Sequence, residues 1–328
     1  MPSPVDAPIL RYLSAADVDR CLPDVFTRLD LAERALRALG RGDAEMPPKI
    51  GVHPRSGALL HAMPAWLRDG DVVGLKWVSA FPANRARGLP AINGLVVLND
   101  PETGMPTWIM DAARITAVRT AAVSGVAVRL LRSERVERVA ILGAGIQARS
   151  HLEVMGTLLP GVPLVVYDRH PERAGALARE ARDAGLSVQP ATDAREAIAS
   201  SSVVVTVATL GSPAQVMTPD WVSPQTLVVA ADFATYVSAE LARTAARFVV
   251  DDREQFLAYR DAGYFEGYPE PSATLGEVLD ERAAPPDGKP SDATTVVSHL
   301  GVGLADVVLA DAISRRAAEM GAGMELPR

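Results

Sequence analysis

The hydrophobic positions in the first hundred residues change from a helical spacing to short runs. Leu29, Ala32, Leu36 and Leu39 recur at helical intervals, and two glycines follow the last of them. This spacing predicts an amphipathic helix that a glycine ends. The next apolar runs are short and are separated by Gly, Pro, Asn and Asp, which is typical of strands. The predicted strands span residues 58–62, 72–78 and 92–98.

An alanine-rich segment with helical spacing follows these strands. Residues 117–131 place Val123, Val126 and Leu130 on one apolar face, and Thr116 stands directly before them as a candidate N-cap. The sequence therefore predicts a long, well-buried helix that begins after Thr116.

From residue 136 onward, predicted strands and helices alternate. The strands are expected at residues 136–142, 164–167, 203–208, 227–231 and 248–250, and helices at 172–184 and 194–199. Such alternation favours a doubly wound α/β domain, in which helices cover both faces of a parallel sheet. Residues 263–290 read as loops around one short helix near 275–279, and residues 304–320 as a helix that folds back onto the first domain.

Composition and charge restrict the kind of partner. The 328 residues carry a formal charge of −7 with 48% apolar residues, and no Lys/Arg run stands out. Nucleic acid and anionic membranes are therefore unexpected partners, and no apolar run is long enough to span a bilayer. The amino terminus lacks a signal-peptide pattern, and Cys21 has no second cysteine to pair with. We expect a cytoplasmic protein that acts on a small molecule. We expect no metal site, because the histidines lack the spacing of metal ligands.

A glycine-rich motif lies where a dinucleotide fingerprint should lie. Gly143-x-Gly145-x-x-Ala148 follows a predicted strand and opens a helix. Two glycines allow a tight turn and a close approach of a pyrophosphate, whose charge the free N–H groups of the helix amino end would meet. A glycine-rich turn without a ligand is the alternative reading.

Asp168 ends the next predicted strand and favours NAD(H). A carboxylate at this place accepts hydrogen bonds from the ribose hydroxyls and repels a 2′-phosphate. Arg169 and His170 follow directly and could neutralise such a phosphate, so NADP(H) stays open.

Four further residues are candidates for substrate chemistry. Lys76 lies within an otherwise apolar run, where an ionised amine is costly unless it is paired or lines a site. Lys49 and Arg119 are further anion holders, with a salt-bridged or snorkelling side chain as the alternative reading. Asp232 follows a predicted strand, and strand carboxyl ends face the ligand crevice in such sheets. A turn-capping aspartate would explain Asp232 equally well.

Taken together, several stretches in the same order resemble the ornithine cyclodeaminase and mu-crystallin family. The resemblance covers nearly the whole chain. The stretches are Met63-Pro64, Lys76-Trp77-Val78 through Gly88-Leu89-Pro90, Asp111, Thr116 with Arg119-Thr120-Ala121-Ala122, the motif at residues 143–148, and Gly301 with Asp306.

The resemblance implies a fold and a division into domains. It implies a homodimer with a Rossmann domain, residues 119–301, inserted into an α+β domain for substrate binding and dimerisation, residues 1–118 with 302–328. It also implies hydride transfer at the Cα of an amino acid or its imine.

The resemblance assigns roles to individual residues. Lys76 and Arg119 match the carboxylate-binding lysine and arginine, and Lys49 stands where an arginine is common. Asp232 is the candidate catalytic aspartate, with Lys76 beside it in the catalytic set, and His61 is a further substrate-binding candidate. The expected cofactor site consists of Gly143, Gly145, Ile146, Gln147, Ala148, Asp168, Arg169, Thr209 and His299.

Three departures from the family pattern concern the substrate and the chemistry. In cyclodeaminases the residues before Met-Pro include a substrate-contacting glutamate, whereas this chain has His61-Ala62-Met63-Pro64. The segment after Asp232 also lacks their Gly-Lys-x-Glu pattern. His299 replaces a serine that is common near the nicotinamide. These departures weaken the expectation of ornithine specificity and deamination.

Three functions follow as hypotheses. The first is an NAD(P)-dependent imine reductase or amino-acid dehydrogenase, in which orientation of the substrate and the cofactor's hydride supply most of the catalysis. The second is an ornithine cyclodeaminase, an ammonia-lyase that recycles NAD and yields proline. The third is a binding protein for a dinucleotide or another small ligand that has lost catalysis.

Overall fold

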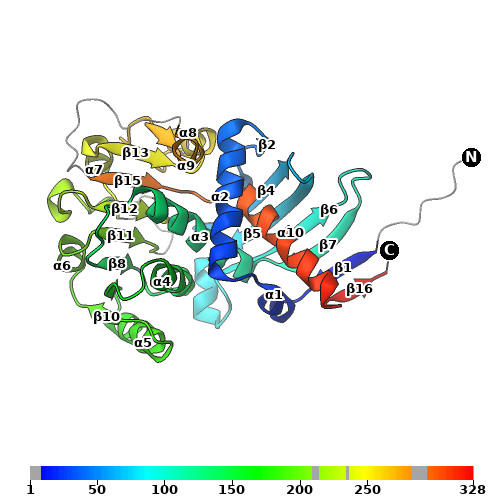
Figure 1. The fold of residues 1–328 in the computed structure, drawn as a ribbon, viewed down its shortest axis with the longest axis horizontal. Coiled ribbons are helices and arrows are strands. Elements are labelled where there is room, and N and C mark those ends of the chain that lie inside the picture. Colours follow the sequence, from blue (N-terminus) through cyan, green and yellow to red (C-terminus); the bar gives the residue numbers. More distant parts are fainter. Residues whose placement is uncertain (1–8, 209–213, 234–235, 282–293, 328) are drawn as a thin grey trace, which may run out of the picture. The chain divides into compact units, whose positions relative to one another are not determined.

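The computed structural model describes residues 9–208, 214–233, 236–281 and 294–327 (Figure 1). Two compact units divide the chain. Unit 1 comprises residues 1–31, 42–119 and 302–328, and unit 2 comprises residues 32–41 and 120–301. Residues 32–41, which the sequence analysis kept with the amino-terminal domain, thus belong to unit 2 in the structure.

Unit 1 is built on one sheet that follows the order β16-β1-β7-β6-β5-β4-β2, with β3 paired to β4. All of its strand pairs are antiparallel except β1 with β7. The strands are β1 (Leu10–Leu13), β2 (Ala44–Glu45), β3 (Ile50–Arg55), β4 (Ala58–Leu67), β5 (Val72–Ala80), β6 (Ile92–Asn99), β7 (Pro106–Asp111) and β16 (Met324–Leu326). The helices are α1 (Ala15–Cys21), η1 (Pro82–Arg87) and α10 (Gly303–Glu319), and α2 (Val25–Arg41) begins here.

Helix α10 covers one face of this sheet, against β4, β5 and β6 (Figure 1). Side chains alternate between the faces of a strand, so Lys76 turns toward the α10 face and Trp77, the next residue of β5, turns away from it. Gly303 allows the close approach, because a Cβ there would lie 2.9 Å from the Met63 carbonyl oxygen. Burial of this face by a C-terminal helix agrees with the expectation that residues 304–320 fold back.

Unit 2 contains a second sheet in the order β10-β9-β8-β11-β12-β15-β13-β14, with every pair parallel. Its strands are β8 (Val139–Leu142), β9 (Leu164–Tyr167), β10 (Val188–Ala191), β11 (Val203–Thr206), β12 (Leu227–Ala230), β13 (Arg247–Val250), β14 (Ala273–Thr274) and β15 (Thr295–Ser298). Its helices are α4 (Ile146–Leu158), α5 (Pro171–Asp183), α6 (Ala194–Ala199), η2 (Pro219–Trp221), α7 (Ala239–Thr244), α8 (Arg253–Asp261) and α9 (Leu275–Leu279), and α3 (Ala113–Leu131) ends here.

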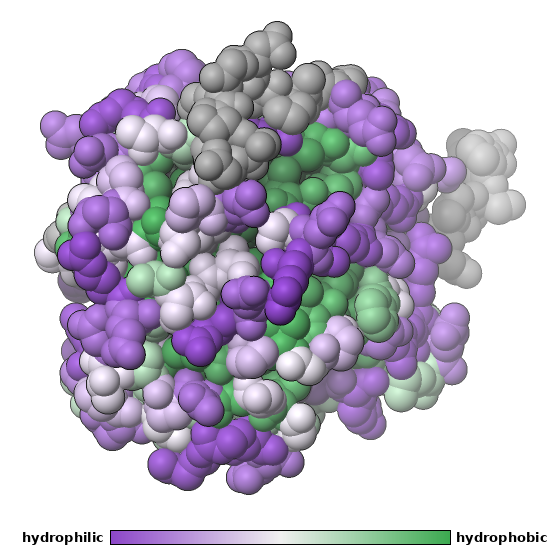
Figure 2. Space-filling model, turned by 60° about the vertical axis from the view of Figure 1, so that its left-hand side comes forward, coloured by the Kyte–Doolittle hydropathy of each residue, from purple (hydrophilic) through white to green (hydrophobic). Residues whose placement is uncertain are grey.

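The central strands of unit 2 are buried on both faces. Every residue of β8, β11 and β12 is buried, as a parallel sheet with helices on both sides requires. The strand order reverses between β8 and β11, and ligands bind at the carboxyl ends of strands at such a switch point. The Rossmann-type doubly wound fold expected from the alternation is thereby confirmed. On the face shown in Figure 2, most protruding side chains are hydrophilic and apolar side chains are visible deeper between them.

The prediction of the long helix was wrong at its start. Helix α3 begins at Ala113, so Thr116 lies inside it and is not the N-cap. The Asp111 carboxylate accepts a hydrogen bond from the Ala113 N–H at 2.9 Å, which serves the same purpose one turn earlier. Apolar periodicity does not reveal this helix start, because the residue that caps it, Asp111, is polar.

Strand β15 was missed because it lies between segments that read as loop and helix. It inserts between β12 and β13, although it follows both in the chain. The predicted loop at residues 263–290 does contain α9 at Leu275–Leu279, whereas its end, from residue 282, lies outside the described residues. Within the described part of the chain, no helix is long and apolar enough to cross a membrane.

Candidate functional site

The glycine motif of unit 2 forms a turn in which the position of Gly143 favours glycine. Gly143 follows β8 with φ +120°, and a Cβ there would lie 2.7 Å from the Val207 carbonyl oxygen, after β11. Gly145 is the N-cap of α4 without a side-chain cap, and a Cβ there would meet nothing within 4 Å. No side chain therefore blocks the approach of a phosphate to the backbone N–H groups at the amino end of α4.

The first turn of α4 offers a polar atom for a ligand. Gln147 Oε1 is buried and has no hydrogen-bond partner among the described residues. Ile146 is 50% exposed, whereas Ala148 is fully buried against the sheet. An acceptor buried without a partner is costly, and a ligand donor such as a ribose hydroxyl would satisfy it. The residues present thus fit a dinucleotide.

Two aspartates follow β9 and β12, which β8 and β11 separate in the sheet, and they are held in the same way. Asp168, after β9, accepts a hydrogen bond from the Ala144 N–H at 2.9 Å through Oδ2. Asp232, after β12, accepts one from the Ala208 N–H at 3.3 Å through Oδ2 and is 1% exposed. Both carboxylates are therefore fixed at the carboxyl edge of the sheet by backbone groups of the adjacent strand. The hydrogen bond from the Ala208 N–H joins Asp232 to the segment just after β11, and the Asp232 carboxylate lies at the edge where ligands bind.

Aromatic side chains support the segment that carries Asp232. Phe233 has φ +51°, a left-handed conformation that is unusual for a bulky residue. Its ring packs against Tyr259, Tyr264 and Phe265, with centroids 5.3, 5.9 and 6.2 Å away. This packing offsets the strain and orients the chain directly after Asp232.

The remaining residues proposed for the cofactor site lie at the same edge or outside the description. Arg169 is exposed next to Asp168, and His170 is the N-cap of α5. His299 follows β15 and is 2% exposed. Its backbone N–H donates to the Ala230 carbonyl oxygen at 2.9 Å. Thr209 lies outside the described residues.

Unit 1 holds a second group of candidate residues, a buried cluster of three charged side chains. Lys76 Nζ lies 2.7 Å from Asp306 Oδ2, and Arg119 Nε lies 3.0 Å from Asp306 Oδ1. Lys76 is 1% exposed, Arg119 6% and Asp306 0%. Strand β5, helix α3 and helix α10 each supply one member. Lys76 and Arg119 therefore both form salt bridges, as the alternative interpretation expected. They share a single carboxylate, so the cluster has two cations and one anion.

The excess cation of this cluster has an open hydrogen-bonding position. Arg119 Nη1 is buried and has no hydrogen-bond partner among the described residues. Burial and the neighbouring Arg119 lower the pKa of Lys76 to about 8, against the opposing effect of Asp306. A second carboxylate brought to this cluster would neutralise the excess charge and satisfy the guanidinium.

His61 is a further buried candidate residue of unit 1, and Lys76 acts on it electrostatically. It lies on β4 and is 8% exposed, and a Cβ at Gly51 of β3 would lie 2.3 Å from its ring, so the glycine makes room for it. Burial, with Lys49, His53 and Lys76 nearby, lowers the pKa of His61 to about 4. His61 is thus neutral at physiological pH, among groups of positive charge.

Sequence reasoning gave no role to three buried polar residues. Asp306 was noted only as part of a resembling stretch, although its place in the apolar run Gly303-Leu304-Ala305-Asp306-Val307-Val308 is the signal that marks a paired charge. His151 was set aside for lack of metal-ligand spacing, and Ser124 was read only as part of a helix. Both lie fully buried in one hydrogen-bonded group with His299.

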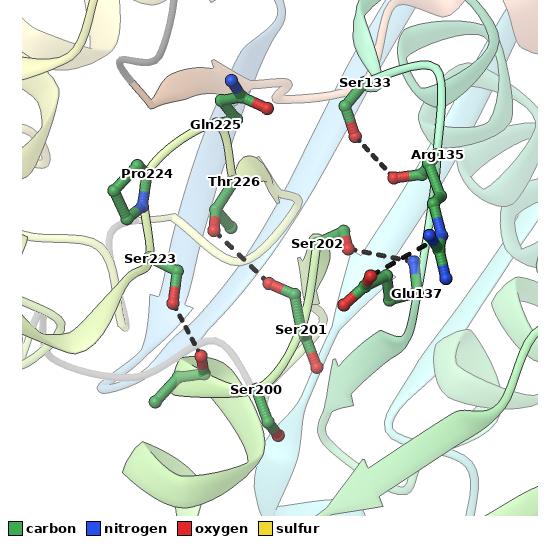
Figure 3. A pocket seen from close by; sticks show the side chains of 11 residues that line it. Ser133, Arg135, Glu137, Ser200, Ser201, Ser202, Ser223, Pro224, Gln225 and Thr226 are labelled. Atoms are coloured by element: carbon green, nitrogen blue, oxygen red, sulfur yellow. Dashed lines mark hydrogen bonds and ion pairs between the residues drawn. The ribbon is translucent and has the colours of Figure 1, made fainter.

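A surface hollow lies at the opposite end of the central strands of unit 2 (Figure 3). Residues of the segments before β8, β11 and β12 line it, and its polar groups bond among themselves. Ser223 Oγ donates to the Ala199 carbonyl, and Ser202 Oγ accepts from the Glu137 N–H. This hollow lies at the amino ends of the strands and shows no group that requires a ligand. Among the described residues, no group of three or more metal-ligating side chains gathers.

Comparisons with known proteins agree with this geometry. The chain is 37% identical over 318 residues to the nodulation efficiency protein NfeD of Rhizobium meliloti, which covers 97% of this chain and 98% of that protein. It is 32% identical over 310 residues to alanine dehydrogenase of Archaeoglobus fulgidus, which covers 91% and 92%.

Solved structures share the fold over nearly the full length. Delta(1)-pyrroline-2-carboxylate reductase of Thermococcus litoralis, in complex with NADH and L-proline, matches with a TM-score of 0.86 and 26% identity, over 96% of this chain and 100% of that one. An archaeal alanine dehydrogenase dimer with bound NAD gives 0.84 and 29%, over 97% and 99%. A lysine cyclodeaminase gives 0.84 and 28%, over 98% and 96%.

The family assignment follows from the sequence model of one family, which matches residues 13–321. The chain belongs to the ornithine cyclodeaminase/mu-crystallin family.

Proposed function

We propose that this protein is an NAD(P)-dependent reductase of a carboxylate-bearing imine, or an amino-acid dehydrogenase that runs the same step in reverse. The single observation that carries the proposal is the buried Lys76–Asp306–Arg119 cluster. It has two cations and one carboxylate, and Arg119 Nη1 has no hydrogen-bond partner among the described residues. A substrate carboxylate is the ligand that completes it.

The glycine turn, Gln147 and Asp168 support a dinucleotide as cofactor. The bound dinucleotide supplies a hydride for Cα or accepts one from it. Asp168 at the end of β9 favours NAD(H), because a carboxylate at that position repels a 2′-phosphate.

The protein's own residues bind the substrate and handle the proton. Lys76 and Arg119 would hold the substrate carboxylate, with Lys49 as a further cation. When an imine accepts the hydride at Cα, its nitrogen gains a proton, and Asp232 is the residue we assign to that transfer. A carboxylate already fixed at the strand edge needs no reorganisation to act.

His61 favours reduction over cyclodeamination. A cyclodeaminase must hold the distal amine of a diamino acid, for which an anionic partner is needed. The charged groups that act on His61 are Lys49, His53 and Lys76, all cationic when protonated. A second ammonium would therefore be repelled at this side of the cluster.

The test of this function is the absorbance of the reduced cofactor at 340 nm. NADH and NADPH are offered in parallel with cyclic ketimines, and with keto acids plus ammonia or methylamine. Stoichiometric oxidation of the reduced cofactor is expected, faster with NADH. Ammonia release from ornithine or lysine without net absorbance change would overturn the reductase and establish the cyclodeaminase. Tight dinucleotide binding with no turnover on any of these compounds would point to a binding protein.

We also propose that two copies of the chain associate through the face of the unit 1 sheet that lies opposite α10. Ile50, Ala62, Trp77 and Leu95 are successive register partners across β3, β4, β5 and β6, on the face away from α10. Ile50 is 71% exposed, and Trp77 and Leu95 are each 40% exposed. A continuous apolar row of this kind is typical of an interface, and the similar archaeal alanine dehydrogenase is a dimer.

A further inference from the structure

Three buried side chains of unit 2 form one continuous hydrogen-bonded chain. Ser124 Oγ lies 2.8 Å from His151 Nε2 and 2.8 Å from His299 Nε2. His151 Nδ1 lies 2.8 Å from the carbonyl oxygen of Gln147. Ser124 and His151 are 0% exposed and His299 is 2% exposed. The chain thus joins α3, the first turns of α4 and the end of β15.

The chemistry of these groups fixes the direction of every hydrogen bond. A carbonyl oxygen only accepts, so His151 Nδ1 carries a proton and donates to Gln147. Burial lowers the pKa of His151 to about 4, so the ring is neutral and its Nε2 is an acceptor. The single Ser124 proton must then point to His151, and the Ser124 oxygen accepts from His299, whose proton therefore sits on Nε2.

Both ends of this chain lie at the edge where the dinucleotide is expected. Gln147 is in the first turn of the helix that Gly145 caps, and its side-chain Oε1 is a buried atom without a partner in the described structure. His299 follows Ser298, which pairs with Ala230 two residues before Asp232. The next residues are also held, because Asp251 Oδ2 accepts from the Gly301 N–H at 2.7 Å and Gln255 Nε2 donates to the Gly301 carbonyl at 3.3 Å.

We infer that His299 is a positioning residue of the dinucleotide site, set by a one-directional chain His299–Ser124–His151–Gln147 that ties the end of β15 to the first turn of α4. The inference rests on the proposed dinucleotide binding. His299 held in this way donates from Nε2 to Ser124, which fixes the orientation of its ring at the carboxyl edge of the sheet.

The first experiment reads the tautomers directly. Ring ¹⁵N shifts of the histidines, measured on the full-length protein at pH 7 with and without NADH, distinguish a protonated nitrogen from an acceptor nitrogen. His151 is expected with its proton on Nδ1 and His299 with its proton on Nε2. His299 protonated on Nδ1 alone, or His151 protonated on Nε2 alone, would overturn the chain.

The second experiment tests whether the chain serves the cofactor. Ser124→Ala removes the central link, and its expected effect is a roughly tenfold weaker affinity for NADH in a fluorescence titration, the size of one lost hydrogen bond. Ser201→Ala is the matched control, because Ser201 is also a buried serine of unit 2 and donates only to the Ala197 carbonyl of its own helix segment. The control is expected to bind NADH as the wild type does.

Two variants of His299 separate positioning from mere packing. His299→Gln retains an amide N–H near the position of Nε2, so it keeps the bond to Ser124 and is expected to keep the His151 tautomer. His299→Asn loses that reach and is expected to release Ser124 and alter the His151 shifts. Equal NADH affinity of Ser124→Ala and the wild type would overturn the positioning role, whereas a wild type that binds neither NADH nor NADPH would overturn the proposed function instead.

Discussion

The buried carboxylate of Asp306 offers the sharpest test of the proposed substrate site. It accepts from Lys76 Nζ at 2.7 Å and from Arg119 Nε at 3.0 Å, inside a region where none of the three side chains is more than 7% exposed. Asp306→Asn keeps the shape and one acceptor oxygen but removes the charge. Two cations then face each other with no anion between them.

The expected loss of stability follows from the burial. Removing one partner of a buried ion pair costs about 3–5 kcal/mol, because the other charge stays desolvated without compensation. The Asn oxygen still accepts one hydrogen bond, so we expect a loss near the lower end, about 3 kcal/mol. Domains of ordinary stability retain their fold after such a loss, and urea unfolding at pH 7 measures it.

The same variant should move the pH dependence of catalysis. Lys76 with a pKa of about 8 is protonated below pH 8 and binds a carboxylate there, so kcat/KM of the wild type should fall as the pH rises through 8. Asp306 is the group that raises this pKa against burial and Arg119. In Asp306→Asn the pKa of Lys76 falls, and the descending limb moves to lower pH.

Glu270→Gln provides a control for the loss of a carboxylate as such. Glu270 pairs with Arg260 at 2.6 Å with 64% of its side chain exposed, and pairs of this kind contribute at most about 1 kcal/mol. If Asp306→Asn cost no more stability than Glu270→Gln and left the pH limb in place, the assignment of Lys76, Asp306 and Arg119 as one anion-binding cluster would be refuted.

Four other predictions rest on single features of the structure. Arg119→Lys removes Nη1, which has no hydrogen-bond partner in the described part of the chain. A tenfold or larger rise in KM for the carboxylate substrate is expected in steady-state kinetics, with a smaller change in kcat. Gly143→Ala brings a Cβ to 2.7 Å from the Val207 carbonyl oxygen at φ +120°, so both the melting temperature and NADH binding should decrease. Trp77→Asp places a charge in the apolar row of the sheet and should shift the protein to a monomer in light scattering, while Val52→Asp, at the edge of that face, should have a weaker effect. The unfolding free energy should fall as the pH drops from 6.5 toward 4, and His151 should contribute up to about 3 kcal/mol of this loss. In this range the His151 ring of the unfolded chain binds a proton, whereas the folded ring, with its pKa of about 4, does not. A flat profile of unfolding free energy against pH would contradict the argument that burial lowers this pKa.

Elements that depend on local signals were predictable from the sequence. The predicted helix at residues 194–199 matches α6, and the predicted strand at residues 164–167 matches β9, because each has flanking breakers and a clear apolar pattern. The glycine turn after β8 was also predictable, because a Gly-x-Gly pattern between a predicted strand and a predicted helix is typical of a tight strand-to-helix turn. The start of α3 was not, because Asp111 rather than the expected threonine accepts a hydrogen bond from the first N–H of the helix, that of Ala113.

Pairings between distant residues were beyond the reach of sequence patterns. Asp306 lies 230 positions after Lys76, and the apolar spacing of α10 does not reveal which strand the aspartate faces. The same holds for Ser124 and His299, 175 positions apart, whose hydrogen bond depends on where β15 enters the sheet. Each residue could be recognised from the sequence as a polar side chain inside an apolar run. Its hydrogen-bond partner could be identified only from the three-dimensional structure.

The two units handle buried polar groups in different ways, and this difference separates their chemistry. In unit 1, burial is compensated by charge, and the balance of two cations to one carboxylate leaves the cluster one negative charge short. In unit 2, the hydrogen-bonded chain through Ser124 consists of neutral side chains and a backbone carbonyl, as with His151 on Gln147. An incomplete charge balance attracts an anionic substrate, whereas a satisfied neutral chain attracts nothing and instead holds its members still. Substitutions in the first group should therefore alter mainly affinity for the substrate carboxylate, and substitutions in the second mainly the geometry in which a dinucleotide is held.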